Sequence, residues 1–250
     1  MEREQIRISV RNLVEFILRS GDIDNRRASL DTMEAMQAGS RLHRKIQKKM
    51  GSTYHAEVPL NIIIEEENYE LGIWGRADGI IIEETVTIDE IKGVYLSLDL
   101  LEEPVKVHLA QAKCYAYIYG IQNDLQKINV QMTYGNLDTG DLKYFSYEYS
   151  MQQLQEWFSD LILKYKKWAD FQYEWRKKRQ ASIKELAFPF PYREGQKELA
   201  AGVYRTIARK KNLFIQAPTG VGKTISTLYP AIKAVGEGLG DKILYLTAKT

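Results

Sequence analysis

Apolar positions recur along the chain with two periods, one typical of helices and one typical of strands. A helical period predicts helices over residues 6–18 and 28–50. Alternating apolar residues bounded by turn residues predict three successive strands, at 54–64, 69–82 and 85–91. Because short turns join these strands, we expect a three-stranded meander.

The same pattern predicts a second group of elements further along the chain. An amphipathic helix is expected over 105–120, a strand over 127–134 and a returning strand over 142–149. A long helix then begins at Ser150, where Gln153 completes a capping box. We expect its many aromatic side chains to pack in a core or cover the sheet, with base stacking as the alternative.

Two prolines mark a boundary in the last third of the chain. Pro189 and Pro191 end any helix that reaches them. Beyond them the pattern predicts a helix, a strand, a helix and a strand, at 195–208, 213–216, 224–235 and 242–247. The last three of these elements form a βαβ unit. We therefore expect two domains, residues 1–185 and 186–250.

Composition changes this picture little. The 250 residues are 44% hydrophobic and 27% charged, which is ordinary for a soluble globular protein. No apolar run approaches the roughly 18–20 residues of a membrane helix, and the charged N-terminus lacks a signal-peptide core. The single cysteine excludes an internal disulfide and a four-cysteine metal or iron–sulfur site. These features favour a cytoplasmic protein without a membrane segment.

Charge is informative only locally, because the formal net charge is +2. Cations gather at 41–49, 164–167 and 176–179. A solvated helix face is the commoner explanation of such clusters, and contact with phosphate groups is the other. Both interpretations stay open at this point.

Candidate chemistry begins with carboxylates on the predicted meander. Asp78 interrupts an apolar strand, where an acid is costly unless a cation satisfies it. Glu90 and Lys92 are two residues apart and share one face of the next strand. Glu57, on the first strand, can approach the same corner. Carboxylate oxygens suit Mg²⁺, which activates a bound water, and Lys92 can hold that water or offset charge on a phosphate.

Four motifs around these residues resemble the RecB-type nucleases of the PD-(D/E)XK superfamily. The motifs are a Gly-x-x-x-His helix, a Gly-x-x-Asp strand, an acid-x-Lys strand and a Gln-x-x-x-Tyr helix. They are formed here by Gly39 and His43, Gly75 and Asp78, Glu90 and Lys92, and Gln111 and Tyr115. The resemblance implies an α/β fold whose core is a mixed sheet flanked by helices.

The resemblance also implies the roles of single residues. The implied metal ligands are His43, Asp78, Glu90 and Glu57, and the implied ion is Mg²⁺ or Mn²⁺. The implied catalytic residues are Asp78, Glu90, Lys92, Gln111 and Tyr115. Lys92 would be the catalytic lysine, while Gln111 and Tyr115, one helical turn apart, would orient the site or the DNA backbone.

Three further residues near these motifs have simpler expectations. His108 shares a helix face with the glutamine–tyrosine motif and is expected to face the site, whereas His55 is expected to be structural. Several of the similar nucleases hold an iron–sulfur cluster with four cysteines, and this chain departs from them. We expect its Cys114 to be a small buried side chain behind the motif.

A second motif lies near the end of the chain. Residues 217–224, Ala-Pro-Thr-Gly-Val-Gly-Lys-Thr, stand between a predicted strand and a predicted helix. Backbone N–H groups, a lysine and a hydroxyl in this arrangement bind nucleotide phosphates and Mg²⁺. The sequence thus predicts a phosphate-binding loop, with Gly220, Gly222, Lys223 and Thr224 as its ligands for ATP.

The loop and its flanks resemble superfamily 2 helicases, in which alanine usually opens this motif. Residues 190–196 resemble the adenine-contacting stretch of the XPD/DinG helicases, which implies that Gln196 contacts ATP. Residues 245–250 resemble their next motif, which touches the DNA strand. The resemblance implies an ATP-dependent DNA helicase, of which 186–250 would be the N-terminal fragment of the ATP-binding domain.

The two halves suggest one joint function. We expect a divalent-metal-dependent DNA nuclease module of an ATP-dependent helicase–nuclease that processes or repairs DNA, with single-stranded or forked DNA as its substrate. No Asp-Glu pair and no arginine finger follow the loop, so we treat the chain as the N-terminal portion of a longer protein. The alternative is a catalytically inactive module that binds DNA and feeds it to the motor. A P-loop kinase or transport ATPase is disfavoured, and no obligate protein partner is inferred.

Overall fold

The computed structural model describes residues 3–20 and 31–247, with side chains from residue 34 onward in the second range. It contains two compact units, Met1–Ala169 and Asp170–Thr250. Helix α4 (Met151–Lys184) contributes residues to both units. The domain boundary at 185/186 remains a prediction, and each unit is described by itself below.

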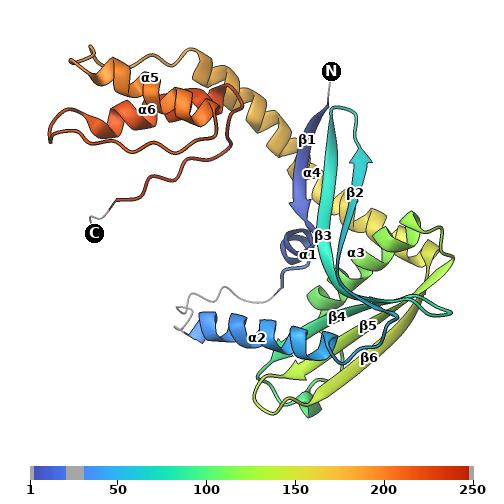
Figure 1. Ribbon diagram of the computed structural model, residues 1–250. Helices are drawn as coiled ribbons and strands as arrows, with labels where there is room; N and C mark the ends of the chain where they lie inside the picture. The colour runs from blue at the N-terminus through green and yellow to red at the C-terminus, as the bar shows by residue number, and fades with distance from the viewer. Residues whose placement is uncertain (1–2, 21–30, 248–250) are drawn as a thin grey trace. The chain divides into compact units, whose positions relative to one another are not determined.

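A mixed β-sheet forms the centre of the first unit (Figure 1). Its six described strands are β1 (Glu4–Ser9), β2 (Tyr54–Glu65), β3 (Tyr69–Ile81), β4 (Thr87–Val94), β5 (Lys127–Asn136) and β6 (Leu142–Ser150). Strand β3 pairs antiparallel with both β2 and β4, which confirms the meander. Strand β5 is parallel to β4, and β6 returns antiparallel to β5.

Strand β1 departs from the prediction. The pattern over 6–18 predicts a helix, but residues up to Ser9 pair in parallel with β3, and helix α1 spans only Val10–Ile17. Ile6 and Ile8 alternate with polar residues, and a segment this short fits either period until a neighbouring strand is available. Ser9 marks the change, because its hydroxyl accepts a hydrogen bond from Asn12 N at 3.2 Å and caps the helix.

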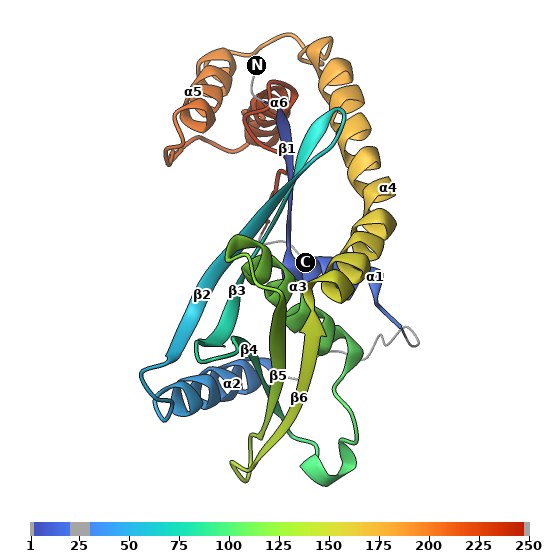
Figure 2. The same ribbon diagram turned by 90° about the vertical axis from the view of Figure 1, so that its right-hand side faces the viewer.

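Helices α2 (Asp31–Gln47) and α3 (Lys106–Gln122) cover opposite faces of the sheet (Figure 2). The neighbouring residues Ile91 and Lys92 of β4 demonstrate this arrangement. Ile91 packs against Leu42 and Ile46 of α2, whereas Lys92 reaches α3, and successive strand residues point to opposite faces. The start of the predicted helix 28–50 lies outside the described residues, and its end is at Gln47.

Apolar side chains fill the layer between α3 and the sheet. The fully buried residues include Ile73, Ile88, Val130, Met132 and Ile118. Cys114 is also fully buried, as expected, and burial raises the pKa of its thiol. The first part of α4 adds to this core, since Phe158 stacks on Tyr117 with ring centroids 4.4 Å apart. The expected packing role of the α4 aromatics is therefore confirmed at Phe158.

The capping box at the start of α4 is also confirmed. Gln153 N donates to Ser150 Oγ at 3.2 Å, and Ser150 N donates to Gln153 Oε1 at 2.9 Å. A short 3₁₀ helix, Leu98–Leu100, precedes α3. The described helices include none that combines the length and the apolar character of a membrane-spanning segment.

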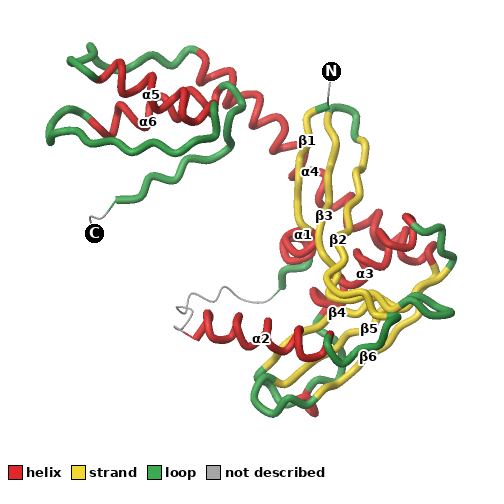
Figure 3. Tube along the Cα trace, viewed as in Figure 1, coloured by secondary structure: helices red, strands yellow, loops and turns green. Residues whose placement is uncertain are grey.

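The second unit contains α5 (Gln196–Ala208) and α6 (Lys223–Gly236), which pack against each other. The strands predicted at 213–216 and 242–247 are absent from the described residues, and these segments are loops (Figure 3). A strand exists only when its backbone pairs with a neighbour, and neither segment has such a partner. Their apolar side chains remain in solvent, with Phe214 95% and Leu246 91% exposed. Of the predicted βαβ unit, only the helix is formed.

Candidate functional site

The candidate site of the first unit forms where the sheet splits. Along one edge of β3, strand β1 pairs with residues 69–74 and strand β4 pairs with residues 79–81. Neither strand pairs with residues 75–78 between them. This unpaired stretch is the Gly75-Arg-Ala-Asp78 motif, so the divergence of β1 and β4 opens space for its side chains.

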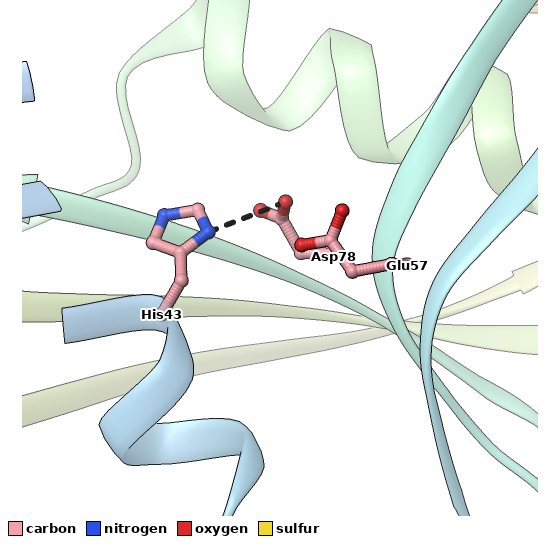
Figure 4. Close-up of side chains that lie close together, drawn as sticks. All are labelled: His43, Glu57 and Asp78. Atoms are coloured by element: carbon pink, nitrogen blue, oxygen red, sulfur yellow. Dashed lines mark ion pairs between the residues drawn. The ribbon is translucent and has the colours of Figure 1, made fainter. Parts of the chain in front are cut away.

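Three potential metal ligands meet at this split (Figure 4). His43 of α2, Glu57 of β2 and Asp78 of β3 each offer one ligand atom, and these atoms lie within 4.8 Å of one another. His43 Nδ1 is 3.4 Å from Asp78 Oδ1. The other carboxylate oxygen of Asp78 accepts a hydrogen bond from Ile91 N at 2.9 Å. The cluster thus joins three elements that are separate in sequence.

Helix α2 contributes two residues to the site, His43 and Gln47, which lie one helical turn apart. His43 points to Asp78, and Gln47 lies on the same face. Gln47 Nε2 donates to Glu57 Oε1 at 3.3 Å and to the backbone oxygen of Asp78 at 3.0 Å. Leu42 and Ile46, on the adjoining face, are buried and anchor the helix. Gln47 is a positioning residue that sequence reasoning missed.

Glu57 occupies an uncommon backbone conformation. Its φ is 57°, in the left-handed region that residues other than glycine rarely adopt. The β2–β3 ladder is interrupted here, with pairs on both sides but none between Glu57 and Asp78. The side chain is held by Arg76, whose Nε is 2.6 Å from Glu57 Oε2. Such strain is concentrated at functional sites, where the surrounding structure enforces it.

Glu90 and Lys92 approach the split from the α3 side of β4. As the spacing predicts, they share a face, and Lys92 Nζ is 2.7 Å from Glu90 Oε1. Lys92 Nζ also donates to Gln111 Oε1 of α3 at 3.4 Å. Asp89 points to the other face, where Tyr54, Gln131 and Thr133 hydrogen-bond its carboxylate. Asp89 therefore belongs to the core and not to the site.

The environment of Glu90 suits a bound cation. The residue is fully buried, and its Oε2 has no hydrogen-bond partner among the described residues. Burial, followed by the negative charge of Asp78, raises the pKa of Glu90 to about 8. A buried carboxylate oxygen without a partner is costly, and a nearby divalent ion would satisfy it. The cluster of His43, Glu57 and Asp78 offers one imidazole and two carboxylates, which fits Mg²⁺ or Mn²⁺, and Glu90 lies outside that cluster.

Gln111 and Tyr115 close the α3 side of the site. Burial and the charge of Glu90 raise the pKa of Tyr115, so its phenol stays protonated. The ring lies directly over Gly75, where a Cβ atom would come within 2.6 Å of Tyr115 Oη. Glycine is therefore required at the first position of this motif because the tyrosine occupies the space of a side chain.

A cavity of about 370 Å³ borders these residues and is lined in part by His43, Lys92, Gln111 and His108. His108 thus faces the site, as expected, and its Nδ1 is 3.1 Å from Tyr134 Oη. Burial, together with the charge of Lys92, lowers the pKa of His108 to about 4. Arg11 of α1 also lines the cavity, and sequence reasoning missed it because it lies in a helix far from the motifs.

The phosphate loop of the second unit has its own local geometry. Gly220 and Gly222 have φ values of 86° and 77°, which favour glycine. Lys223 begins α6, and its Nζ donates to the carbonyl oxygens of Ala217 and Pro218 at 2.9 Å each. Thr224 Oγ1 lies 3.3 Å from Tyr245 Oη.

Gln196 of α5 is bound to this loop. The residue is buried, and its Nε2 donates to the carbonyl oxygen of Val221 at 2.8 Å. Its Oε1 accepts from Arg193 N at 2.9 Å. The residues expected to bind nucleotide are therefore gathered within the second unit. The residues 248–250 of the predicted DNA-contacting motif lie outside the described part of the chain.

Comparison with known proteins gives partial matches. No protein-family model matches the chain. A segment of 51 residues, 20% of this chain, is 51% identical to the probable ATP-dependent helicase MJ0942 of Methanocaldococcus jannaschii. The match spans only 8% of that helicase.

Two solved structures share part of the arrangement at low sequence identity. The crystal structure of SSO0001 has a TM-score of 0.40 and 19% identity, and the match covers 65% of this chain and 78% of that chain. An alkaline exonuclease from Laribacter hongkongensis has a TM-score of 0.44 and 15% identity, with 70% and 94% covered. The mixed α/β fold described above rests on the strand order and register of this chain and not on either likeness.

Proposed function

We propose that the first unit is a divalent-metal-dependent deoxyribonuclease. The observation that carries this proposal is the cluster of an imidazole and two carboxylates at the split in the sheet, next to the buried Glu90 and its ion-pair partner Lys92. His43, Glu57 and Asp78 form a compact cluster, and the charge of Asp78 acts on the buried Glu90. Paired oxygen ligands beside a lysine are the equipment for hydrolysis of a phosphodiester.

The residues have distinct tasks in this proposal. His43, Glu57, Asp78 and Glu90 would hold Mg²⁺ or Mn²⁺. When bound, the ion lowers the pKa of a water molecule and offsets negative charge on the phosphate. Lys92 donates a hydrogen bond to the attacking water or to a phosphate oxygen. Gln111 orients the Lys92 ammonium, and Tyr115 donates from a phenol that stays protonated.

Hydrolysis adds the water oxygen to phosphorus and breaks one P–O bond, leaving a phosphate monoester and a hydroxyl. The carboxylates must be ionised to bind a cation. Because burial favours the protonated form of Glu90, cation binding displaces a proton from this site near neutral pH.

A cleavage assay tests the proposal. The chain, first stripped of metal, should cleave single-stranded or forked DNA after addition of Mn²⁺ or Mg²⁺. Asp78→Asn should lose both cleavage and the calorimetric Mn²⁺ signal. Lys92→Ala should retain Mn²⁺ affinity and lose cleavage by about 10²–10³-fold, as expected when one electrostatic stabiliser is removed.

Asp89→Asn provides the control, because that carboxylate is not among the clustered ligand atoms and is already hydrogen-bonded by Tyr54, Gln131 and Thr133, so Mn²⁺ binding should stay intact. Equal Mn²⁺ affinity in the wild type and Asp78→Asn would rule out the metal site. Metal-dependent DNA binding without any cleavage would instead favour a module that binds DNA for a motor.

We infer that the second unit is the nucleotide-binding start of an ATP-dependent DNA helicase. Three features support this: the two left-handed glycines, Lys223 at the start of α6, and the contact of Gln196 with the loop. The chain also contains a segment of 51 residues that is 51% identical to a probable ATP-dependent helicase. Equilibrium dialysis of the intact protein with labelled ATP tests this inference, and undiminished binding by Lys223→Ala would contradict it.

A further inference from the structure

The outward surface of α2 carries positive charge that the proposed reaction does not use. Its cations are Arg41, Arg44 and Lys45, followed by Lys48 and Lys49 in the turn after the helix, and all five are exposed. None of them forms an ion pair with an acid of the described residues. By contrast, exposed cations elsewhere on the first unit do pair, such as Arg3 with Glu65 and Lys127 with Glu148.

The position of these cations follows from the helical period. Successive residues turn by about 100° around a helix, so α2 presents different faces to its surroundings. Leu42 and Ile46 face the core, and His43 and Gln47 face the metal cluster. The next positions around the helix are Arg44 and Lys48, followed by Arg41. The cationic surface therefore begins where the face that bears the metal ligand ends.

Lys45 differs from the other cations of this helix. Its Nζ lies 3.5 Å from the position that a Cβ atom would take on Gly140, so it leans toward the β5–β6 turn. That turn carries Asp138 and Asp141, which would repel an anion. Glu34 is the one acid among the described side chains of α2, and it lies about two helical turns before Arg41. An anionic ligand is therefore favoured on the Arg41, Arg44 and Lys48 surface.

We propose that Arg41, Arg44 and Lys48 bind consecutive phosphates of the DNA strand that enters the metal cluster. The proposal rests on the proposed nuclease function and adds the surface that guides its substrate. From Arg41 to Lys48 the helix rises by about 10 Å, and one strand of DNA carries about three phosphates over that axial length. Contacts to phosphates carry no base information, so binding through this surface is independent of sequence.

A metal-free binding experiment tests the surface separately from catalysis. Fluorescence anisotropy with a labelled single-stranded oligonucleotide of mixed sequence is measured in EDTA over a range of salt concentrations. The test variant is Arg41→Gln, Arg44→Gln and Lys48→Gln combined. Glutamine has a helix propensity close to that of arginine and lysine, so the helix should persist. A thermal melt followed by circular dichroism verifies this.

Loss of three phosphate contacts on a single strand should lower the slope of log K against log salt by about 2 in magnitude. Affinity at about 0.1 M salt should fall by about 100-fold. A matched control, Arg3→Gln, Lys127→Gln and Lys164→Gln, removes the same charge from positions that are already ion-paired, and it should bind like the wild type. Replacing Arg41 and Arg44 with lysine should retain most of the affinity, because the charge remains.

The outcomes separate this inference from the nuclease proposal. If the test variant binds DNA with wild-type affinity and salt dependence, or if the control variant loses as much affinity, the assigned surface is wrong even when the protein cleaves DNA. If the wild type binds through this surface but no metal restores cleavage, the nuclease proposal fails and the binding surface stands. The same titrations are repeated with a duplex of the same sequence. If the protein binds the duplex more tightly than the single strand, and the three substitutions lower both affinities equally, the assignment to one strand is wrong.

Discussion

At the scale of single residues, the candidate site holds two acids in unfavourable states. Glu57 has a left-handed backbone, and Glu90 is buried with one carboxylate oxygen unpartnered. Neither state can be inferred from the short motifs, because each arises from contacts with distant elements. Both are explained if the fold is built around a cation that compensates the local cost.

The backbone of Glu57 gives a prediction that separates strain from chemistry. Glu57→Gly and Glu57→Ala both remove the carboxylate, so both should weaken Mn²⁺ binding to the same extent. Alanine retains the penalty of a positive φ whereas glycine does not. The glycine variant should therefore be more stable by about 1 kcal/mol in urea unfolding. Equal stability would show that the backbone relaxes out of the left-handed region.

His108 gives a prediction for pH. Burial lowers the pKa of its imidazole to about 4 in the folded protein, below the ordinary value of 6.5 that is expected after unfolding. Between these values the unfolded chain binds the extra proton, so this group makes stability rise with pH from about 4 to 6.5 and leaves it level above that. The raised pKa of Glu90 acts in the opposite direction.

Comparison with a variant isolates the contribution of His108. The urea midpoint of the wild type should fall further than that of His108→Gln when the pH is lowered from above 6.5 toward 4. The contribution of Glu90 is common to both proteins and cancels in this comparison. Parallel pH profiles for the two proteins would contradict the assignment.

At the scale of elements, the site depends on how two helices approach a divided strand. α2 brings His43 and Gln47 from one face, and α3 brings Gln111 and Tyr115 from the other. Strand β1 pairs with the first part of one edge of β3, and β4 pairs with its last part. The unpaired stretch between them leaves space for the side chains of both helices. Each element is ordinary by itself, and the site is a property of their arrangement.

The two glycines of the recognised motifs should respond oppositely to alanine. A Cβ atom at Gly75 would come within 2.6 Å of Tyr115 Oη, so Gly75→Ala should cost about 1–3 kcal/mol through overpacking. Gly39 lies inside α2 with nothing within 4 Å of its Cβ position. Gly39→Ala should therefore stabilise the protein by about 0.5–1 kcal/mol. Thermal unfolding of both variants provides the measurement, and destabilisation by Gly39→Ala would reveal a contact that the fold does not show.

At the scale of the whole molecule, the candidate nuclease residues and the phosphate loop lie in separate compact units. The proposed metal ligands and Lys92 belong to the first unit, whereas Gln196 and the phosphate loop belong to the second. The chain therefore has two candidate chemistries whose dependence on each other can be tested by substitution.

Cleavage by this chain should be indifferent to ATP and to Lys223→Ala, because no residue of the second unit belongs to the metal site. ATP hydrolysis should be undetectable. After the loop the chain offers only Glu237 and Asp241 as acids, and Asp241 pairs with Arg176 and Arg179. Steady-state phosphate release measures this, and turnover abolished by Lys223→Ala would contradict the prediction.

The sequence alone determined the order of most elements and the identity of most candidate site residues. Helices and caps depend on neighbours within one or two turns, so the 105–120 helix and the Ser150 capping box could be predicted. The two-residue period of a strand likewise placed Glu90 and Lys92 on one face. These features are local, and a local pattern is sufficient for them.

Tertiary structure decided everything that depends on pairing between distant segments. Ile6 lies in a strand because its backbone pairs with the edge of β3. The apolar segment around Phe214 pairs with no strand of the described residues and is therefore a loop. The left-handed backbone of Glu57 and the presence of Arg11 in the same cavity as Lys92 have the same origin, since each is imposed by elements far away in the chain. The cations of α2 can be identified in the sequence, but their position beside the cluster of His43, Glu57 and Asp78 follows only from which face of the helix the core buries.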